Sequence, residues 1–294
     1  MNLEQLATFV HVAEHGSFSK AALVLDAAQP SLSRQVRALE VELREPLLLR
    51  HGRGVQLTEA GRQLLDHCRG ILHLVALAKE DLAARRDEPV GHITIAMTPT
   101  LARLHTLPLI RAFRNEMPKA RLTVIEGFSA HITEWLTSGR ADLGLVYNPE
   151  PLPSLEILPL REERLFLVSP ADEAPRGPVT VRQLGSFPLV MPERGHTFRK
   201  LMESAAAMAG VQLRVEWEVS SVPVILDLVG AGLGHAALGE DAIRPLQHLK
   251  RLAVTPIVRP DVKFTLCLVT PAQRRATLLR ERTVNVLEKL VRSA

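Results

Sequence analysis

The sequence predicts an α+β multidomain chain with three parts: a small helical unit with a β-hairpin, one long helix, and a larger α/β domain. Residues 1–57 carry short helical patterns and almost no strand signal. Residues 58–88 follow one helical pattern that ends at Asp87-Glu88-Pro89, since proline cannot continue a helix. From Val90 onward, short β-rich runs alternate with helical stretches, which is typical of a layered domain with mostly parallel strands. We therefore expect domains at 1–58, 59–88 and 89–294.

Composition and charge restrict the class of protein. The 294 residues are 46% hydrophobic and 23% charged, which is enough for two or three packed units. No apolar run approaches the roughly 20 residues that cross a bilayer, and Glu4 and Gln5 stand where an export signal needs positive charge. We expect a cytoplasmic protein without membrane contact. The net charge is +4, but residues 1–88 hold eleven Lys and Arg against twelve Asp and Glu, so DNA binding would depend on where the positive charge is placed.

The first two predicted helices form a packing platform. The first has an apolar stripe at helical spacing, made of Leu3, Leu6, Val10 and Ala13. Gly16 ends this helix and Ser17 caps the next one. The second helix has a stripe whose small alanines allow another helix to cross closely: Phe18, Ala21, Ala22 and Leu25.

The third predicted helix, from Gln29 to Leu43, has two contrasting faces. One is apolar and consists of Leu32, Val36, Leu39 and Leu43. The opposite face gathers Pro30, Ser33, Arg34 and Arg37. Its hydroxyl and guanidinium groups suit base edges and phosphates in the DNA major groove, whereas the alternative is an ordinary solvated face. Two short helices joined to this one by tight turns favour DNA recognition.

A β-hairpin is expected after the third helix. Two short extended runs, 46–49 and 55–58, flank the turn Arg50-His51-Gly52-Arg53-Gly54. We expect Arg50 and Arg53 at the tip, where they would enter the minor groove or neutralise phosphate. With this hairpin, the N-terminal unit becomes a winged helix-turn-helix.

The long helix carries a coiled-coil pattern. Apolar residues alternate in steps of four and three along it: Leu64, Cys68, Ile71, Val75, Ala78 and Leu82. We expect Leu64, Cys68, Ile71, Val75 and Leu82 to form a two-fold dimer contact, and the alternative is packing on the helix's own domain. The only two cysteines, Cys68 and Cys267, lack metal-ligand spacing and are expected to be reduced thiols.

At this point the chain resembles the LysR-type transcriptional regulators. The stretches QPSLSRQVRALE (29–40) and RHGRGVQLTEAG (50–61) together are specific for that family. The expected DNA-binding set is Gln29, Pro30, Ser31, Ser33, Arg34, Arg37, Arg50 and Arg53. Three positions depart from the family pattern: Ala28 replaces a capping Ser or Thr, Arg44 a glycine, and Leu48 a phenylalanine.

The resemblance extends over nearly the whole chain. ADLGLV (141–146) and LVGAGLGHAAL (228–238) are similar to the family's C-terminal α/β periplasmic-binding-protein-like two-lobed sensor domain. It implies lobe I at 90–160 plus 263–294, and lobe II at 161–262. The implied partners are a double-stranded DNA operator, a small-molecule effector between the lobes, other copies of the chain as dimers that pair into tetramers, and RNA polymerase. No cofactor is expected.

The effector site is expected where the strand ending at Met97 meets a helix. Hydroxyls of Thr98 and Thr100 beside free helix N–H groups suit a carboxylate, although they would serve equally as simple helix caps. The family analogy adds Ser129, His131, Tyr147, Asn148, Met191 and His196. Arg103, Arg199 and His196 would supply positive charge, so we expect a small organic anion. The alternative is a regulator that needs no effector.

Catalytic motifs are weak. His11-Val12-Ala13-Glu14-His15 matches the H-x-x-E-H pattern of zinc peptidases, but it lies inside the predicted DNA-binding unit and lacks an identifiable third ligand. The glycines at 230–234 follow a helix instead of a strand, and His235 replaces the last required glycine of a dinucleotide motif. We therefore expect neither an enzyme nor a metal site. The competing hypothesis is a small-molecule binding protein whose N-terminal helices only mediate assembly.

Overall fold

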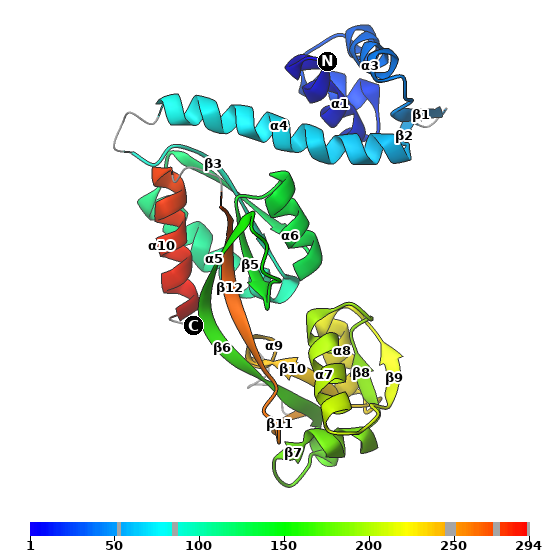
Figure 1. Cartoon of the computed structure of the whole chain (residues 1–294), viewed down its shortest axis with the longest axis vertical. Helices are drawn as coiled ribbons and strands as arrows, with labels where there is room; N and C mark the ends of the chain where they lie inside the picture. Colours follow the sequence, from blue (N-terminus) through cyan, green and yellow to red (C-terminus); the bar gives the residue numbers. More distant parts are fainter. Residues whose placement is uncertain (52–53, 84–87, 245–250, 273–276, 293–294) are drawn as a thin grey trace.

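The computed structural model of the chain describes residues 1–51, 54–83, 88–244, 251–272 and 277–292, with the side chains of 73, 77 and 79–83 excepted. Figure 1 shows a small N-terminal unit and a two-lobed domain, with one long helix beside both. The N-terminal unit consists of α1 (Leu3–His15), α2 (Phe18–Val24), α3 (Gln29–Leu43), β1 (Leu48–His51) and β2 (Gly54–Leu57). The long helix α4 runs over Glu59–Ala83. In the described part of the chain, no helix is both long and apolar enough to cross a membrane.

The N-terminal unit is built around the apolar stripes of its helices. Asn2 and Gln5 form a capping box that starts α1, and Gly16 ends it in the left-handed conformation. Phe9, Val36 and Leu39 are fully buried where α1 and α3 meet. A polar chain links the same helices, since Thr8 donates to Gln35 and Gln35 donates to Glu4. These contacts anchor α3 on one side only.

The turn after α3 is held by both its backbone and a side chain. Arg44, which stands where the family pattern has glycine, adopts the left-handed conformation at φ 56° and ψ 28°. The Glu40 carboxylate accepts hydrogen bonds from the backbone N–H groups of Leu47 at 2.9 Å and Leu48 at 3.1 Å. The start of α3 has no side-chain cap, as Ala28 implied. The hairpin is thereby fixed against the end of α3.

Strands and helices alternate in the C-terminal domain. Its strands are β3 (Gly91–Met97), β4 (Ala120–Glu126), β5 (Leu143–Tyr147), β6 (Leu155–Pro170), β7 (Val179–Thr180), β8 (Leu189–Met191), β9 (Val215–Glu218), β10 (Ala236–Gly239), β11 (Leu252–Val258) and β12 (Lys263–Pro271). Its α-helices are α5 (Pro99–Glu116), α6 (Ser129–Ser138), α7 (Thr197–Met208), α8 (Val222–Gly230), α9 (Glu240–Ile243) and α10 (Leu278–Arg292). Short 3-10 turns occupy Ala171–Glu173 and Val181–Ser186.

Two long strands carry the chain between the lobes. The main sheet has the order β4-β3-β5-β12-β6-β11-β7, with β10 also paired to β6. β12 is antiparallel to both β5 and β6, and β10 and β11 are antiparallel to β6. The expectation of mostly parallel strands is only partly met. β3 is parallel to β4 and β5, β8 to β9 and β7 to β11, whereas β6 and β12 cross between the lobes in opposite directions (Figure 1).

Lobe I contacts the long helix through the end of α6. A Cβ atom added to Gly70 of α4 would lie 2.2 Å from the carbonyl oxygen of Ser138, so only glycine fits at this crossing. Beside it, the Arg140 guanidinium lies over the Trp135 ring at 4.5 Å. Arg69 of α4 pairs with Glu14 of α1 at 2.8 Å. This contact brings the two-lobed domain close to the base of the N-terminal unit.

Candidate DNA-binding surface and ligand pocket

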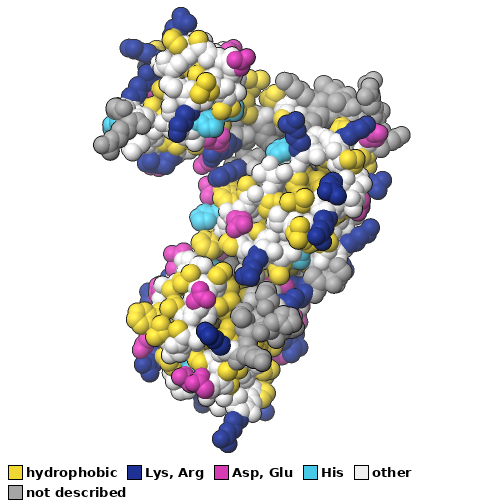
Figure 2. Space-filling model, turned by 180° about the vertical axis from the view of Figure 1, so that it is seen from behind, with side chains coloured by type: hydrophobic (Ala, Val, Ile, Leu, Met, Phe, Trp, Pro, Cys, Tyr) yellow, Lys and Arg dark blue, Asp and Glu magenta, His cyan; other side chains and the backbone are white. Residues whose placement is uncertain are grey.

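One face of α3 is open to solvent except where Arg50 contacts Ser33. Leu32, Val36 and Leu39 are buried on the opposite side. The predicted DNA-binding residues Gln29, Pro30, Arg34 and Arg37 are exposed, while Ser31 and Ser33 are half-buried. Arg34 and Arg37 form no ion pair with any residue that the structure describes, and Figure 2 shows Lys and Arg side chains at the upper end of the N-terminal unit. This face is open to a partner rather than covered by acidic groups.

Only one of the two hairpin arginines, Arg50, is among the residues that the structure describes. Arg53 lies outside the described residues. Arg50 lies in β1 and folds back onto the helices instead of standing at the tip. Its Nη1 donates to Ser33 Oγ at 3.0 Å, and its Cζ lies 4.8 Å from the centre of the Phe18 ring. Arg50 is therefore part of the α3 surface.

The predicted dimer residues of α4 fall into two groups. Cys68 is fully buried and Leu64 is partly buried, and both pack into the core of the N-terminal unit. The prediction that Cys68 contacts a partner is wrong, because its own subunit already covers it. Burial also raises the pKa of the Cys68 thiol to about 11. Farther along, Ile71 is exposed and Val75 half-buried, and the side chain of Leu82 lies outside the described part of α4.

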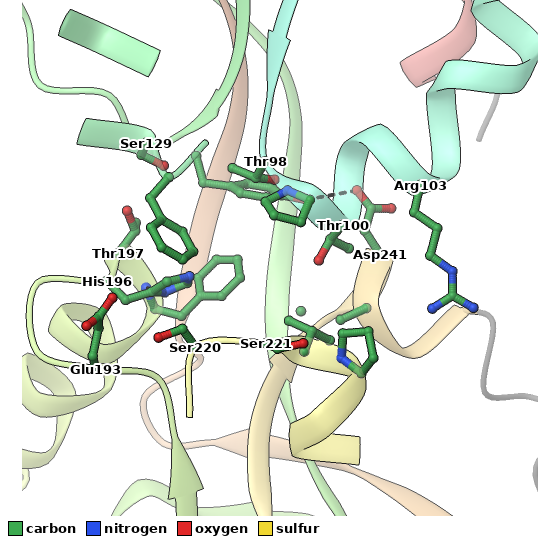
Figure 3. Close-up of a pocket in the computed structure, with 18 of the residues that line it drawn as sticks. Thr98, Thr100, Arg103, Ser129, Glu193, His196, Thr197, Ser220, Ser221 and Asp241 are labelled. Carbon is green, nitrogen blue, oxygen red and sulfur yellow. Dashed lines mark hydrogen bonds between the residues drawn. The ribbon is translucent and has the colours of Figure 1, made fainter. Parts of the chain in front are cut away.

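A pocket of about 880 Å³ lies between the two lobes. Six predicted effector residues line it: Thr98, Thr100, Ser129, His131, Tyr147 and His196. Figure 3 labels Thr98, Thr100, Ser129 and His196 among them. Asn148 and Met191 are not among its lining residues. Asn148 Oδ1 instead accepts from the Thr265 N–H at 2.7 Å, and Met191 is buried in the hydrophobic core. Asn148 follows β5 and Met191 ends β8, but the side chains of both are used elsewhere.

Several helices begin at the pocket. Thr98, Phe128 and Ser221 precede α5, α6 and α8, and none of their side chains caps its helix. The Thr98 hydroxyl oxygen is buried and has no hydrogen-bond partner among the described residues. Helix starts with free N–H groups and hydroxyls attract anions. The alternative role of Thr98 as a simple helix cap is not what the structure shows.

Charge in the pocket differs from the expectation. Arg103 lines it, but Arg199 is only 3% exposed and bonds to the Pro192 carbonyl oxygen at 3.1 Å, so Arg199 serves the core of lobe II. Burial lowers the pKa of His196 and so disfavours its charged form, and its Nδ1 accepts from the Phe198 N–H. Arg199 therefore does not supply charge to the pocket. The charged lining residues are the cations Arg103 and Arg194 and the acids Glu193, Asp227 and Asp241.

The sequence did not point to several other lining residues. Asp241 lines the pocket floor, where it accepts from Tyr147 Oη at 3.0 Å and Arg161 Nη2 at 2.7 Å. Aromatic rings also follow one another across the lobes, with Phe128 edge-on to His196 at 5.6 Å. Ser220 and Ser221 add hydroxyls from lobe II. No local motif marks Asp241, Ser220 and Ser221, because they reach the pocket only where the two lobes pack around it.

A serine–histidine–glutamate arrangement elsewhere in lobe II does not form a catalytic site. His235 Nδ1 lies 2.8 Å from Ser169 Oγ, and Nε2 lies 3.5 Å from Glu173 Oε2. Ser169 is fully buried and cannot meet a substrate. The His11 and His15 rings stack at 6.3 Å, and the described residues contain no group of three metal-binding side chains.

An exposed polar helix beside a hairpin, joined through a long helix to two lobes around a pocket, defines a DNA-binding regulator with an effector-binding domain. Residues 3–62 match the family model of the bacterial regulatory helix-turn-helix protein, lysR family, and residues 86–291 match that of the LysR substrate binding domain. The chain therefore belongs to the LysR family of transcriptional regulators.

Known proteins with similar sequences and folds are regulators and not enzymes. The chain is 32% identical to the nitrogen assimilation regulatory protein nac of Escherichia coli over 93% of this chain and 90% of that protein. It is 30% identical to the DNA-binding transcriptional dual regulator OxyR of E. coli over 99% and 95% of the two chains. Two solved structures share the fold: full-length OxyR from Pseudomonas aeruginosa (TM-score 0.76, 23% identity, covering 99% and 95%) and CbnR with its target DNA (TM-score 0.73, 24% identity, covering 99% and 100%).

Proposed function

We propose that this regulator reads operator DNA through the exposed face of α3 and that a small organic anion in the interlobe pocket controls it. The observation that carries the DNA part is the free polar face of α3, held from behind by buried Leu32, Val36 and Leu39. The residues assigned to DNA are Gln29, Pro30, Ser31, Ser33, Arg34, Arg37, Arg50 and Arg53. RNA polymerase and a cytoplasmic location belong to the same proposal.

Replacing Arg34 with alanine tests the DNA part. A guanidinium bound to a base edge discriminates by about 1–3 kcal/mol, so Arg34→Ala should weaken specific binding by about 5-fold to 150-fold. Binding is measured with DNA upstream of the protein's own gene, identified by footprinting, and the melting temperature should stay unchanged because Arg34 is exposed. Arg111→Ala, an exposed arginine of α5 in lobe I, is the matched control and should bind normally. Unchanged operator affinity in Arg34→Ala would contradict the proposal.

The effector part is supported by the uncapped starts of α5, α6 and α8 and by the unpartnered Thr98 hydroxyl. A panel of small organic carboxylates, each paired with its uncharged methyl ester, is tested by thermal unfolding of the full chain. A bound ligand at 100 times its Kd stabilises the folded state by about 2.7 kcal/mol, which raises Tm measurably. We expect stabilisation by a carboxylate and not by its ester. Equal effects of acid and ester would argue against an anion site.

The assembly part assigns the far half of α4 to a two-fold dimer that pairs into tetramers. Ile71 and Leu74 are exposed apolar residues there, and Val75 is half-buried. We assign residues 1–58 to DNA, 59–88 to the dimer helix and 89–294 to the effector domain, with lobe I at 90–160 plus 263–294 and lobe II at 161–262. A two-fold dimer presents two α3 helices to successive major grooves. The DNA site is then specified by two half-sites, although each N-terminal unit is small.

A further inference from the structure

Two residues of the DNA-binding surface already contact each other in the free subunit. Arg50 donates to Ser33 Oγ at 3.0 Å, and its guanidinium lies against the Phe18 ring at 4.8 Å. Phe18 is buried in the core of the N-terminal unit, so the ring is a fixed support. A cation over an aromatic face is attracted by the ring electrons. Arg50 therefore joins α2, α3 and β1 at the edge of the exposed α3 face.

The hydrogen bond sets the polarity of the Ser33 hydroxyl. A guanidinium has only donors, whereas a hydroxyl has one donor and two acceptor lone pairs. Ser33 must therefore accept from Arg50, and its O–H remains available to donate. Within the part of the chain that the structure describes, no hydrogen bond uses that O–H as a donor. The half-buried Ser33 thus keeps one directed donor for a partner.

The Ser33–Arg50 pair, with Arg34 beside it, offers several hydrogen-bond donors and two positive charges, and its one remaining acceptor is the second lone pair of Ser33 Oγ. In the major groove, guanine presents the acceptors N7 and O6 and thymine presents O4, whereas the cytosine amino group is a donor. Phosphate oxygens are acceptors as well. A serine held in this way keeps its O–H free to donate, and the positive charges of Arg50 and Arg34 favour an acceptor on DNA over the cytosine amino group.

We infer that Arg50 is a positioning residue, which orients the Ser33 hydroxyl to donate to an acceptor on DNA while Phe18 holds Arg50 in place. The inference rests on the proposed function, in which α3 reads DNA, and adds the hydrogen-bond polarity of one contact. It also replaces the expectation that Arg50 acts from the hairpin tip. The acceptor is a base-edge atom or a phosphate oxygen.

A double-mutant cycle on selected DNA tests the pairing. The full chain first enriches duplexes from a randomised library, and the most enriched duplex becomes the probe for wild type, Ser33→Ala, Arg50→Lys and the double variant. Lys keeps the charge of Arg50 but not the planar group that spans Phe18 and Ser33. We expect each single variant to bind about tenfold more weakly. The double variant should be no more than about twofold weaker than Ser33→Ala, because both changes remove one arrangement.

Arg37 provides the matched control for the cycle. It is an exposed arginine on the same face and makes no hydrogen bond to Ser33 among the described contacts. Combining Arg37→Lys with Ser33→Ala should therefore multiply the two separate losses. Circular dichroism melting of each variant checks that the N-terminal unit stays folded, since Arg50 and Arg37 are both exposed.

Each result has a defined meaning. A Ser33→Ala loss that depends on the base at one operator position identifies a base-edge acceptor, and an equal loss on all operator variants identifies a phosphate; both support the inference. Multiplying losses for Ser33→Ala and Arg50→Lys, or full affinity in Arg50→Lys, would overturn it while leaving α3 as the reader. If wild type enriches no sequence, the proposed function itself fails and the inference fails with it.

Discussion

Glu163 is a carboxylic acid inside the strand β6 that carries the chain between the lobes. Its Oε1 accepts from Arg161 Nη2 at 2.8 Å, while its Oε2 is buried without a partner among the described residues. Burial raises the pKa of Glu163 to about 7, and the nearby Asp241 charge acts in the same direction. The titration of this one acid should make the stability of the folded two-lobed domain depend on pH near neutrality.

Glu163→Gln should flatten that dependence. With a pKa of about 7 folded and an ordinary value of 4.5, the folded state holds this proton longer than the unfolded state as pH rises. Stability from this group is therefore complete below pH 4.5 and is lost as pH rises through about 7. Urea unfolding at several pH values between these limits checks it. Parallel curves for wild type and variant would refute the assignment.

The elements of the N-terminal unit were predictable because their signals are local. The stripe of Leu32, Val36 and Leu39 fixed which side of α3 is buried, so its polar face followed from helical geometry alone. The seam of α4 was not predictable in the same way. The spacing of Leu64 and Cys68 predicts that one face of α4 is buried. It does not distinguish burial by the subunit's own core from burial by a partner.

Arg44 offers a test at the level of one helix end. A residue with a Cβ pays a conformational penalty in the left-handed region that glycine does not. Because Arg44 has φ 56°, the Arg44→Gly substitution should raise the free energy of unfolding of the protein by about 0.5–1 kcal/mol, measured by chemical unfolding. Arg44→Ala retains the Cβ and serves as the control that should show no such gain. A loss of stability in the glycine variant would mean that contacts of the Arg44 side chain stabilise the protein by more than its left-handed backbone conformation destabilises it.

At the scale of the molecule, the pocket is where sequence reasoning reached least far. Thr98 and Thr100 could be placed because a strand meets a helix there in lobe I, and Ser129 could be placed only through the family resemblance. Asp241 and Ser220 could not, because they reach the pocket only through the path of β6 and β12 between lobes. Met191 was misplaced for the same reason, since strand register decides which side chains face the pocket.

The dimer is testable at this scale. Ile71 is 36% exposed and Leu74 is 54% exposed on α4. Placing lysine at both positions would bury charge in a two-fold contact, so the double variant should sediment as monomers at concentrations where wild type is dimeric. The control is Leu107→Lys, an equally exposed apolar residue of α5. Sedimentation velocity distinguishes these cases, and an unchanged dimer would exclude this part of α4 from the contact.

The close crossing at Gly70 limits how the sensor can move relative to the reader. Helix α6 starts at the pocket with Ser129 and finishes against α4 at Ser138, beside the Arg69–Glu14 pair. Because the backbone of α6 packs directly on the backbone of α4 at Gly70, there is no space between the two helices into which α6 could move. A rearrangement that begins at Ser129 and shifts α6 toward α4 must therefore separate lobe I from α4 or tilt α4 together with the N-terminal unit.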